Sequence, residues 1–308
     1  MSVAQRFAMR GQILAWKIRA QVLGGNCPVC SAPGAKRRGY GRLFLQCEAS
    51  DCGFIWCHDS SESVANDGMG LVGSWGGVER GGERDDFMVR FLNGAGKPRR
   101  RVLIFGAGTT LVFRVLHDEG FEVEGADVDA EVVNYRSAEF PGQFRHASEL
   151  EHRRGEFDII TACEVFEHLH DPNRWVNILA ANLAPDGVIC GSTSFYPGSG
   201  PIEDGQNPGY MSYTGHVSYW SESALSKCVG RLGFKVVLFE MVCPGSVKPD
   251  LTYGSLFPNK RMFFASRDLE LIAALDALKA RNPILQCDTS DYPVRAYRVA
   301  PLPEIGPH

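Results

Sequence analysis

From residue 99 onward, short apolar runs alternate with segments whose apolar residues recur at helical spacing. The run Arg101–Phe105 (RVLIF) is apolar and ends in glycine, which is typical of a buried strand. The same criteria predict strands at 101–105, 121–126, 157–162, 187–192, 234–242 and 261–265. They predict helices at 109–118, 131–139, 175–183, 221–232 and 268–280, and a short helical stretch ending at Leu169. Strands that alternate with helices indicate a parallel α/β sheet with right-handed crossovers.

The regions around this alternating core differ in pattern. Residues 1–24 place Leu14, Ile18 and Val22 at i+4 spacing, which predicts an amphipathic helix instead of a signal peptide. Residues 25–60 are rich in cysteine, and residues 61–98 are rich in glycine and predict a linker or lid. We expect the α/β domain to occupy 99–267, followed by a C-terminal helix and tail at 268–308.

Composition and charge exclude several classes of protein for this chain. Hydrophobic residues make up 44% of the 308 residues, enough to build a core. The 32 Lys and Arg against 36 Asp and Glu give a net charge of -4, which argues against bulk binding of duplex nucleic acid. No apolar run is long enough for a transmembrane helix, so no membrane association is expected. Ten cysteines without an export signal favour a cytoplasmic protein over a secreted disulfide framework.

Four of the cysteines have the spacing of a metal site. Cys27 and Cys30 form a C-x2-C pair, and Cys47 and Cys52 form a C-x4-C pair. Two such pairs predict a structural zinc in a small zinc-ribbon-like domain. Cys57 and His58 are spare candidates, and Cys57 could replace Cys52. Reduced cysteines without metal are the alternative.

A glycine-containing loop lies between the first strand and the first helix of the α/β region. Gly106, Ala107 and Gly108 let the backbone approach a ligand and leave helix N–H groups facing it. Asp127 follows the next strand, 19 residues after Gly108, where an acid can bind ribose hydroxyls. The third glycine of a dinucleotide loop and the Gly-Lys-Ser/Thr of a P-loop are both missing, so the pattern favours another adenosine-containing ligand.

Four segments in this order carry a family resemblance: VLIFGAGTT, VEGADVDAEVV, FDIITACEVFEHLHDP and LAPDGVICGSTS. Together they resemble the class I S-adenosylmethionine-dependent methyltransferases, and within them the ubiquinone-biosynthesis O-methyltransferases. The cysteine knuckle resembles one found in some bacterial sugar and natural-product methyltransferases. The resemblance implies a Rossmann-like, seven-stranded sheet whose last strand is antiparallel, with S-adenosylmethionine across the strand ends.

The resemblance also implies roles for individual residues. The loop 106–108 would pass under the methionine part of the cofactor, and Asp127 would hold the ribose. Val128 would lie beside the adenine, Ala147 and Ser148 at its edge, and Cys163 and Glu164 would close the cofactor side. The sequence departs from the family at Ile104, where an acid is usual, and at Thr110, where the third glycine is usual.

A cluster of acidic residues and histidines follows the predicted strand at 157–162. Glu164, Glu167 and His168 are at i, i+3 and i+4, which on a helix would be one face. With His216 they offer oxygen and nitrogen ligands for a second, divalent metal. This set resembles the metal site of small-RNA 2'-O-methyltransferases. Without metal, His168 or His216 is the candidate general base, and the segment could instead only cap a helix.

The expected activity is transfer of a methyl group from S-adenosylmethionine to an oxygen of a small molecule, such as a sugar or a phenol. Methylation of an RNA terminus is the first alternative. A non-catalytic, zinc-bearing interaction module is the second. The oligomeric state stays open.

Overall fold

The computed structural model describes residues 25–57, 82–94, 98–196, 208–213, 215–242 and 260–286. The expected helix at 1–24, most of the glycine-rich region, His58 and the tail from 287 lie outside the described residues. Within the described part of the chain, no helix is long and apolar enough to cross a membrane.

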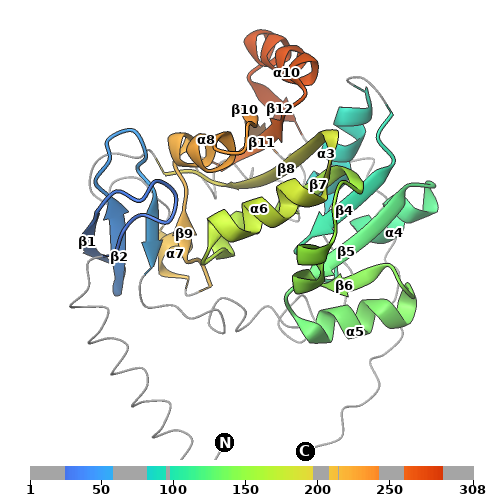
Figure 1. Cartoon of the computed structure of the whole chain (residues 1–308), viewed down its shortest axis with the longest axis horizontal. Coiled ribbons are helices and arrows are strands. Elements are labelled where there is room, and N and C mark those ends of the chain that lie inside the picture. Colours follow the sequence, from blue (N-terminus) through green and yellow to red (C-terminus); the bar gives the residue numbers. More distant parts are fainter. Residues whose placement is uncertain are drawn as a thin grey trace, which may run out of the picture.

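A large sheet of eight strands forms the centre of the molecule (Figure 1). Its spatial order is β12-β10-β11-β8-β7-β4-β5-β6. The strands are β4 (Arg101–Phe105), β5 (Glu122–Asp127), β6 (Phe144–His146), β7 (Phe157–Cys163), β8 (Leu183–Ser194), β10 (Lys235–Val242), β11 (Lys260–Ser266) and β12 (Ile284–Gln286). Only β11 runs antiparallel to its neighbours β8 and β10. The Rossmann-like α/β fold is confirmed, and β12 adds an edge strand to the seven expected ones.

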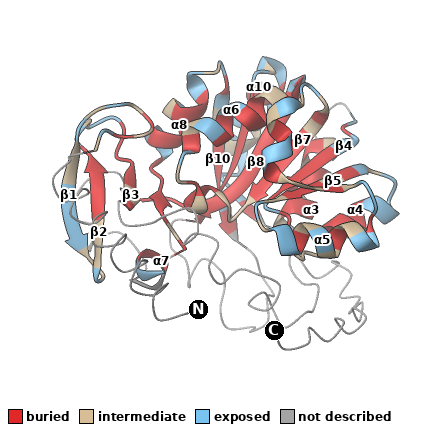
Figure 2. Cartoon of the chain, turned by 60° about the horizontal axis from the view of Figure 1, so that its bottom comes forward, coloured by how far each residue is buried: buried red, intermediate tan, exposed pale blue. Residues whose placement is uncertain are grey.

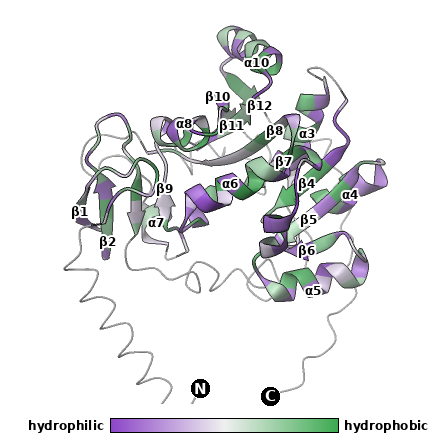
Figure 3. Cartoon of the chain, viewed as in Figure 1, coloured by the Kyte–Doolittle hydropathy of each residue, from purple (hydrophilic) through white to green (hydrophobic). Residues whose placement is uncertain are grey.

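Helices cover both faces of this sheet because its strands alternate their side chains between two cores. On one face Leu103 and Ile160 pack with α6 (Pro172–Asn182) and α8 (Glu222–Gly230). On the other, Val102 and Ile104 pack with α3 (Glu83–Gly94), α4 (Val112–Asp118) and α10 (Leu269–Arg281). Figure 2 shows that the strands are buried and that the outer sides of the helices are exposed. Hydropathy follows the same pattern, because β4 is hydrophobic whereas α4 also carries hydrophilic residues (Figure 3).

Two elements differ from the sequence prediction in ways that shape the site. Helix α3 occupies part of the region expected to be a linker, and it packs on β7 and β8. The predicted helix ending at Leu169 is instead one short 3-10 turn, η3 (Phe166–His168). Glu164 has a positive φ of 56°, so it leaves the helical conformation and the expected common face with Glu167 and His168 does not form.

A second, four-stranded sheet joins the cysteine region to the α/β region. It contains β1 (Gly34–Gly39), β2 (Arg42–Cys47), β3 (Ile55–Cys57) and β9 (Ser218–Tyr219), all antiparallel. Strand β9 comes from the chain between β8 and α8, and pairs Tyr219 with Ile55. A separate core beneath it combines residues from both regions, including Phe44, Ile55, Tyr210, Val217 and Tyr219.

Candidate functional site

The glycine loop after β4 has the backbone shape that only glycine adopts readily. Gly106 and Gly108 have φ values of 72° and 50°. The N–H groups of Gly106 and Ala107 donate to the Ala126 carbonyl at 2.8 and 3.2 Å, which fixes the loop against the end of β5. A Cβ on Gly106 would stand 2.5 Å from Cγ2 of Val165, so this position also has no room for a side chain.

Asp127 ends β5 beside this loop. Its carboxylate accepts hydrogen bonds from the N–H groups of Gly108 and Asp129, both at 2.9 Å. Burial raises the pKa of Asp127, although these two bonds oppose the shift. Carboxylate oxygens have further lone pairs, so the group retains acceptor capacity for a ligand.

The other expected cofactor residues lie at the same edge of the sheet. The His146 side chain accepts a hydrogen bond from the N–H of Ser148, and its Nε2 donates to the Val128 carbonyl at 3.0 Å. Ala147 is buried, and Val128 is 39% exposed. The carboxyl ends of parallel strands share one edge, so β4, β5 and β6 bring these residues together.

Two residues outside the predicted site lie near the two positions at which the sequence departs from the family pattern. Arg136 of α5 (Ala130–Glu139) is fully buried, and its guanidinium donates to the carbonyls of Gly108 and Thr110 at 3.4 and 2.5 Å. It therefore supports the loop where the third glycine is missing. No local sequence signal marks it, because the contact is made across the fold.

The second is Asp85 of α3. Ile104 pairs in register with Thr161, and Asp85 lies buried beside Thr161 and Cys163. A carboxyl group thus reaches the neighbourhood of position 104 from another element. Burial raises the pKa of Asp85.

Glu164 follows β7 and Cys163, and its carboxylate is held by cations. It accepts from Arg84 Nη1 at 2.6 Å and from Ser192 Oγ at 3.0 Å, and it pairs with Lys260 Nζ. Burial alone would raise the pKa of Glu164, but Arg84 and Lys260 lower it to about 2. Glu164 is therefore an ionised anchor between α3 and β11, and the structure does not group it with the two histidines.

Glu167, His168 and His216 do come together. One ligand atom from each lies within 4.8 Å of the others. Nδ1 of His168 donates to the Gly215 carbonyl at 2.9 Å, and Nδ1 of His216 donates to the Tyr210 carbonyl at 2.8 Å. Both Nδ1 atoms are thereby protonated in the neutral rings, which leaves each Nε2 as the acceptor.

The electrostatics of these three groups follow from burial. Burial and the nearby Glu164 raise the pKa of Glu167 to about 8. Burial lowers the pKa of His168, and it lowers the pKa of His216 to about 3. Glu167 Oε2 accepts from Thr193 Oγ1 at 2.9 Å. Its Oε1 is buried and has no hydrogen-bond partner among the described residues. A buried oxygen in that condition, beside two neutral imidazoles, fits a divalent cation.

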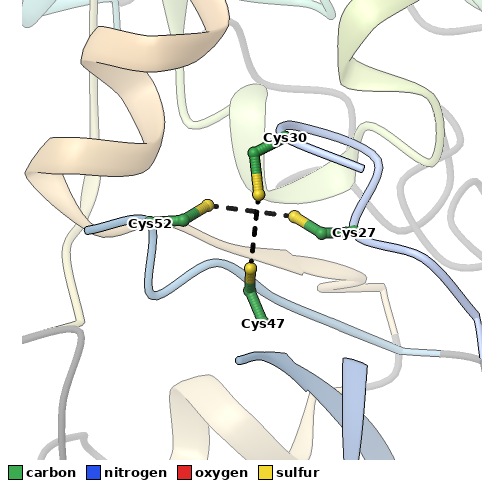
Figure 4. Close-up of side chains that lie close together, drawn as sticks. All are labelled: Cys27, Cys30, Cys47 and Cys52. Carbon is green, nitrogen blue, oxygen red and sulfur yellow. Dashed lines mark hydrogen bonds between the residues drawn. The ribbon is translucent and has the colours of Figure 1, made fainter. Parts of the chain in front are cut away.

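The four predicted zinc ligands also converge. Their sulfurs point toward one another from separate loops (Figure 4), and all four lie within 4.8 Å. Sγ of Cys27 is 3.8 Å from that of Cys52, and Sγ of Cys30 is 3.4 Å from that of Cys47. Sulfurs ~2.3 Å from a tetrahedral zinc stand roughly 3.8 Å apart, so the arrangement fits the ion. Cys57 lies elsewhere, with its thiol directed at the His216 carbonyl.

A Rossmann-like sheet with a glycine loop and an acid after the second strand defines a class of nucleoside-cofactor proteins. Within this class, a family model described as a methyltransferase domain matches residues 81–238, just over half of the chain. The chain belongs to this family. It is an S-adenosylmethionine-dependent methyltransferase.

Solved structures similar to the chain include an S-adenosylmethionine-dependent methyltransferase from Mesorhizobium loti, with 17% identity and a TM-score of 0.44 over 57% of this chain and 95% of that one. Another, from Archaeoglobus fulgidus, has 17% identity and a TM-score of 0.42 over 59% and 93% of the two chains. The magnesium protoporphyrin IX methyltransferase of Synechocystis has 18% identity and a TM-score of 0.37 over 60% and 79%. A search of curated protein sequences finds no match.

Proposed function

We propose that the protein methylates an oxygen of a small molecule that offers two neighbouring hydroxyls, such as a sugar or a phenol. The observation that carries the proposal is the grouping of Glu167, His168 and His216 within 4.8 Å, close after the strand end that bears Cys163. Oxygen and nitrogen ligands of this kind favour a divalent ion. Such an ion, when bound, lowers the pKa of a hydroxyl that it contacts.

The donor side rests on the chain's own residues at the carboxyl ends of β4 and β5. The carboxylate of Asp127 would accept from the ribose hydroxyls, while the loop 106–108 passes under the methionine part. In the transfer, the bond between the sulfonium sulfur and the methyl carbon breaks, and its electron pair stays on sulfur. A new bond forms from the acceptor oxygen to that carbon, so the donor leaves as S-adenosylhomocysteine. The protein's main contribution is to align the two reactants.

The acceptor side must also remove a proton from the reacting hydroxyl. Nε2 of His168 and of His216 has a free lone pair, because each Nδ1–H is committed to a backbone carbonyl. These carbonyls fix the ring orientation, as is usual for histidines that bind metal or move a proton. Without a metal, the same Nε2 atoms supply the general base.

The four-cysteine centre would hold one structural zinc. Contact with Cys27 lowers the pKa of Cys52 to about 5, so a thiolate is available at neutral pH. Such a site stabilises the short β1–β3 region outright, because metal binding free energy becomes folding free energy.

The proposal is tested with S-adenosylmethionine labelled in the transferred methyl group. Zinc-loaded protein is incubated with catechols, sugars, primary amines and short RNA, before and after removal of loosely bound metal. Label on a vicinal diol or catechol, lost on chelation and restored by Mn²⁺, supports the proposal. Transfer to amines alone would contradict the proposal, and transfer to the RNA 3' end would favour an RNA methyltransferase. Full activity after chelation would mean that no metal is needed and that a histidine acts as the general base.

A further inference from the structure

We propose that Arg42, a residue of the cysteine region, positions the segment that carries His216. The cysteine region would then contribute directly to the geometry of the acceptor site. The inference rests on the proposed role of His216. Arg42 is the first residue of β2 in the small sheet. It is a positioning residue, because its contacts are with the backbone around His216.

The Arg42 guanidinium contacts four oxygens of this segment. Nη1 lies 2.6 Å from the Tyr213 carbonyl, 2.9 Å from that of His216 and 3.3 Å from that of Met211. It is also 3.0 Å from the Tyr219 hydroxyl, which itself donates to the His216 carbonyl at 2.9 Å. Two N–H bonds are shared among these acceptors, and hydrogen bonds from a charged donor are stronger than those between neutral groups.

Strand pairing holds the same segment from its other side. The N–H of Cys57 donates to the Val217 carbonyl at 2.8 Å, and the N–H of Val217 donates to the Glu167 carbonyl, also at 2.8 Å. Val217 thus links β3 directly to the turn that bears Glu167 and His168. The cysteine region, His216 and Glu167 form one hydrogen-bonded unit.

Further contacts tie the cysteine loops to the α/β region. Ser221 Oγ donates to the Cys52 carbonyl, Asn173 Nδ2 donates to the Pro28 carbonyl, and Lys227 pairs with Asp51 at 2.5 Å. The ring of Phe44 on β2 packs edge to face with the ring of Tyr219 on β9, with ring centroids 5.6 Å apart. The cysteine region therefore shares a sheet, a core and the hydrogen bonds of Arg42 with the segment that carries His216, and it is not an independent module.

The test compares Arg42→Ala with Arg42→Lys and with Arg37→Ala. Arg37 is the matched control, because it is exposed on the neighbouring strand and its hydrogen bonds go to Gln46 and Lys36 of the same small sheet. Hydrogen exchange is followed in peptides covering 208–221. Affinity for Mn²⁺ is measured by electron paramagnetic resonance in zinc-loaded protein, and affinity for S-adenosylmethionine by calorimetry.

We expect Arg42→Ala to speed exchange in 208–221 at least tenfold and to weaken Mn²⁺ binding at least tenfold, while the affinity for S-adenosylmethionine changes less than twofold. Arg42→Lys should fall between, because the ammonium keeps the positive charge but lacks the rigid, planar guanidinium that fixes the direction of the N–H groups. Arg37→Ala should match the wild type in all three measurements.

Unchanged exchange in Arg42→Ala, or an equal change in Arg37→Ala, would overturn the inference. If the wild type binds no Mn²⁺ outside the cysteine centre, the metal part of the proposed function fails, and the exchange experiment alone decides the role of Arg42. The two failures are therefore distinguishable.

Discussion

Glu164 and Glu167 are three residues apart and have opposite electrostatic environments. Arg84 and Lys260 hold the first ionised with a pKa of about 2, whereas burial raises the pKa of the second to about 8. The positive φ at Glu164 separates them, since it turns one side chain toward α3 and β11 and leaves the other facing the histidines. One acid therefore anchors the structure, and the other is available to the proposed acceptor site.

At the residue scale, Asp127→Ala should weaken S-adenosylmethionine binding at least tenfold. The variant loses the acceptor of the ribose hydroxyls and of the Gly108 N–H, and each charge-assisted bond is worth about 1.5–3 kcal/mol. Calorimetric titration measures the dissociation constant, with exposed Glu131→Ala as the control. An unchanged constant for Asp127→Ala would place the ribose elsewhere.

Glu164→Gln should cost stability in a pH-dependent way. The folded pKa of about 2 lies below the ordinary value of 4.5, so the ionised group stabilises the fold above about pH 4.5 and loses this effect as the pH falls toward 2. The difference in unfolding free energy from the wild type should be about 3 kcal/mol at pH 7 and about half of that at pH 3. Urea titrations at both pH values measure it, and a gap that widens in acid would show that the carboxylate is not paired.

At the element scale, the two loop glycines should respond differently to alanine. Gly108→Ala adds a Cβ into open space and should cost about 1–2 kcal/mol, for the positive φ alone. Gly106→Ala carries the same backbone strain and also meets Val165, which should add about 1–3 kcal/mol. Chemical denaturation of the two variants measures the difference, and equal losses would mean that Val165 moves aside freely.

The cysteine loops should hold one zinc per chain. Closed thiolate sites bind tightly enough to survive purification, so elemental analysis of anaerobically prepared protein should find the metal. Cys27→Ser should lose it and loosen β1–β3, with S-adenosylmethionine affinity largely intact because the cofactor residues lie on the large sheet. Metal-free wild-type protein would contradict this account of the four cysteines.

The periodic elements could be predicted because burial determined them. The runs at β4, β7 and β11 are apolar in the sequence and buried in the fold. The expected bounds of β4 match the observed ones, and those of β7 and β11 differ by one residue at one or both ends. Strands β6 and β12 were missed because each has only three residues. The break at Glu164 has no apolar signature, and the ion pairs that hold its side chain come from residues 80 and 96 positions away.

The site residues also divide into those that a local sequence pattern predicts and those that act through distant contacts. The four cysteines converge, and the expected cofactor residues lie at one edge of the large sheet, because their positions follow from the spacing of two cysteine pairs and from the ends of predicted strands. Arg42, Asp85 and Arg136 could not be found this way. Each acts through a contact with a distant segment, and arginines and aspartates in such positions look like ordinary surface charges in the sequence.

At the scale of the whole molecule, the small sheet places the cysteine region against the segment that carries His216 (Figure 1). Two cores and one shared strand therefore connect the four-cysteine centre to the proposed acceptor side, whereas the proposed donor residues lie at the edge of the large sheet. Changes in the cysteine region should affect acceptor chemistry more than cofactor binding.

His216→Ala should separate these two sides. We expect its affinity for S-adenosylmethionine to stay within twofold of the wild type, because His216 contacts Tyr210 and the small sheet and not the cofactor loop. Methyl transfer to an accepted diol should fall at least a hundredfold, within the range that general acid–base groups contribute. Parallel loss of cofactor affinity would mean that His216 supports the donor side instead.

Glu167, His168 and His216 are proposed to form the acceptor-side centre next to the bound donor. Anomalous diffraction from crystals grown with S-adenosylhomocysteine and Mn²⁺ tests it most directly. We expect a manganese peak bound by these three side chains, with the ribose of the ligand on Asp127. A ligand on Asp127 with no peak among the three side chains, at saturating Mn²⁺, would contradict it.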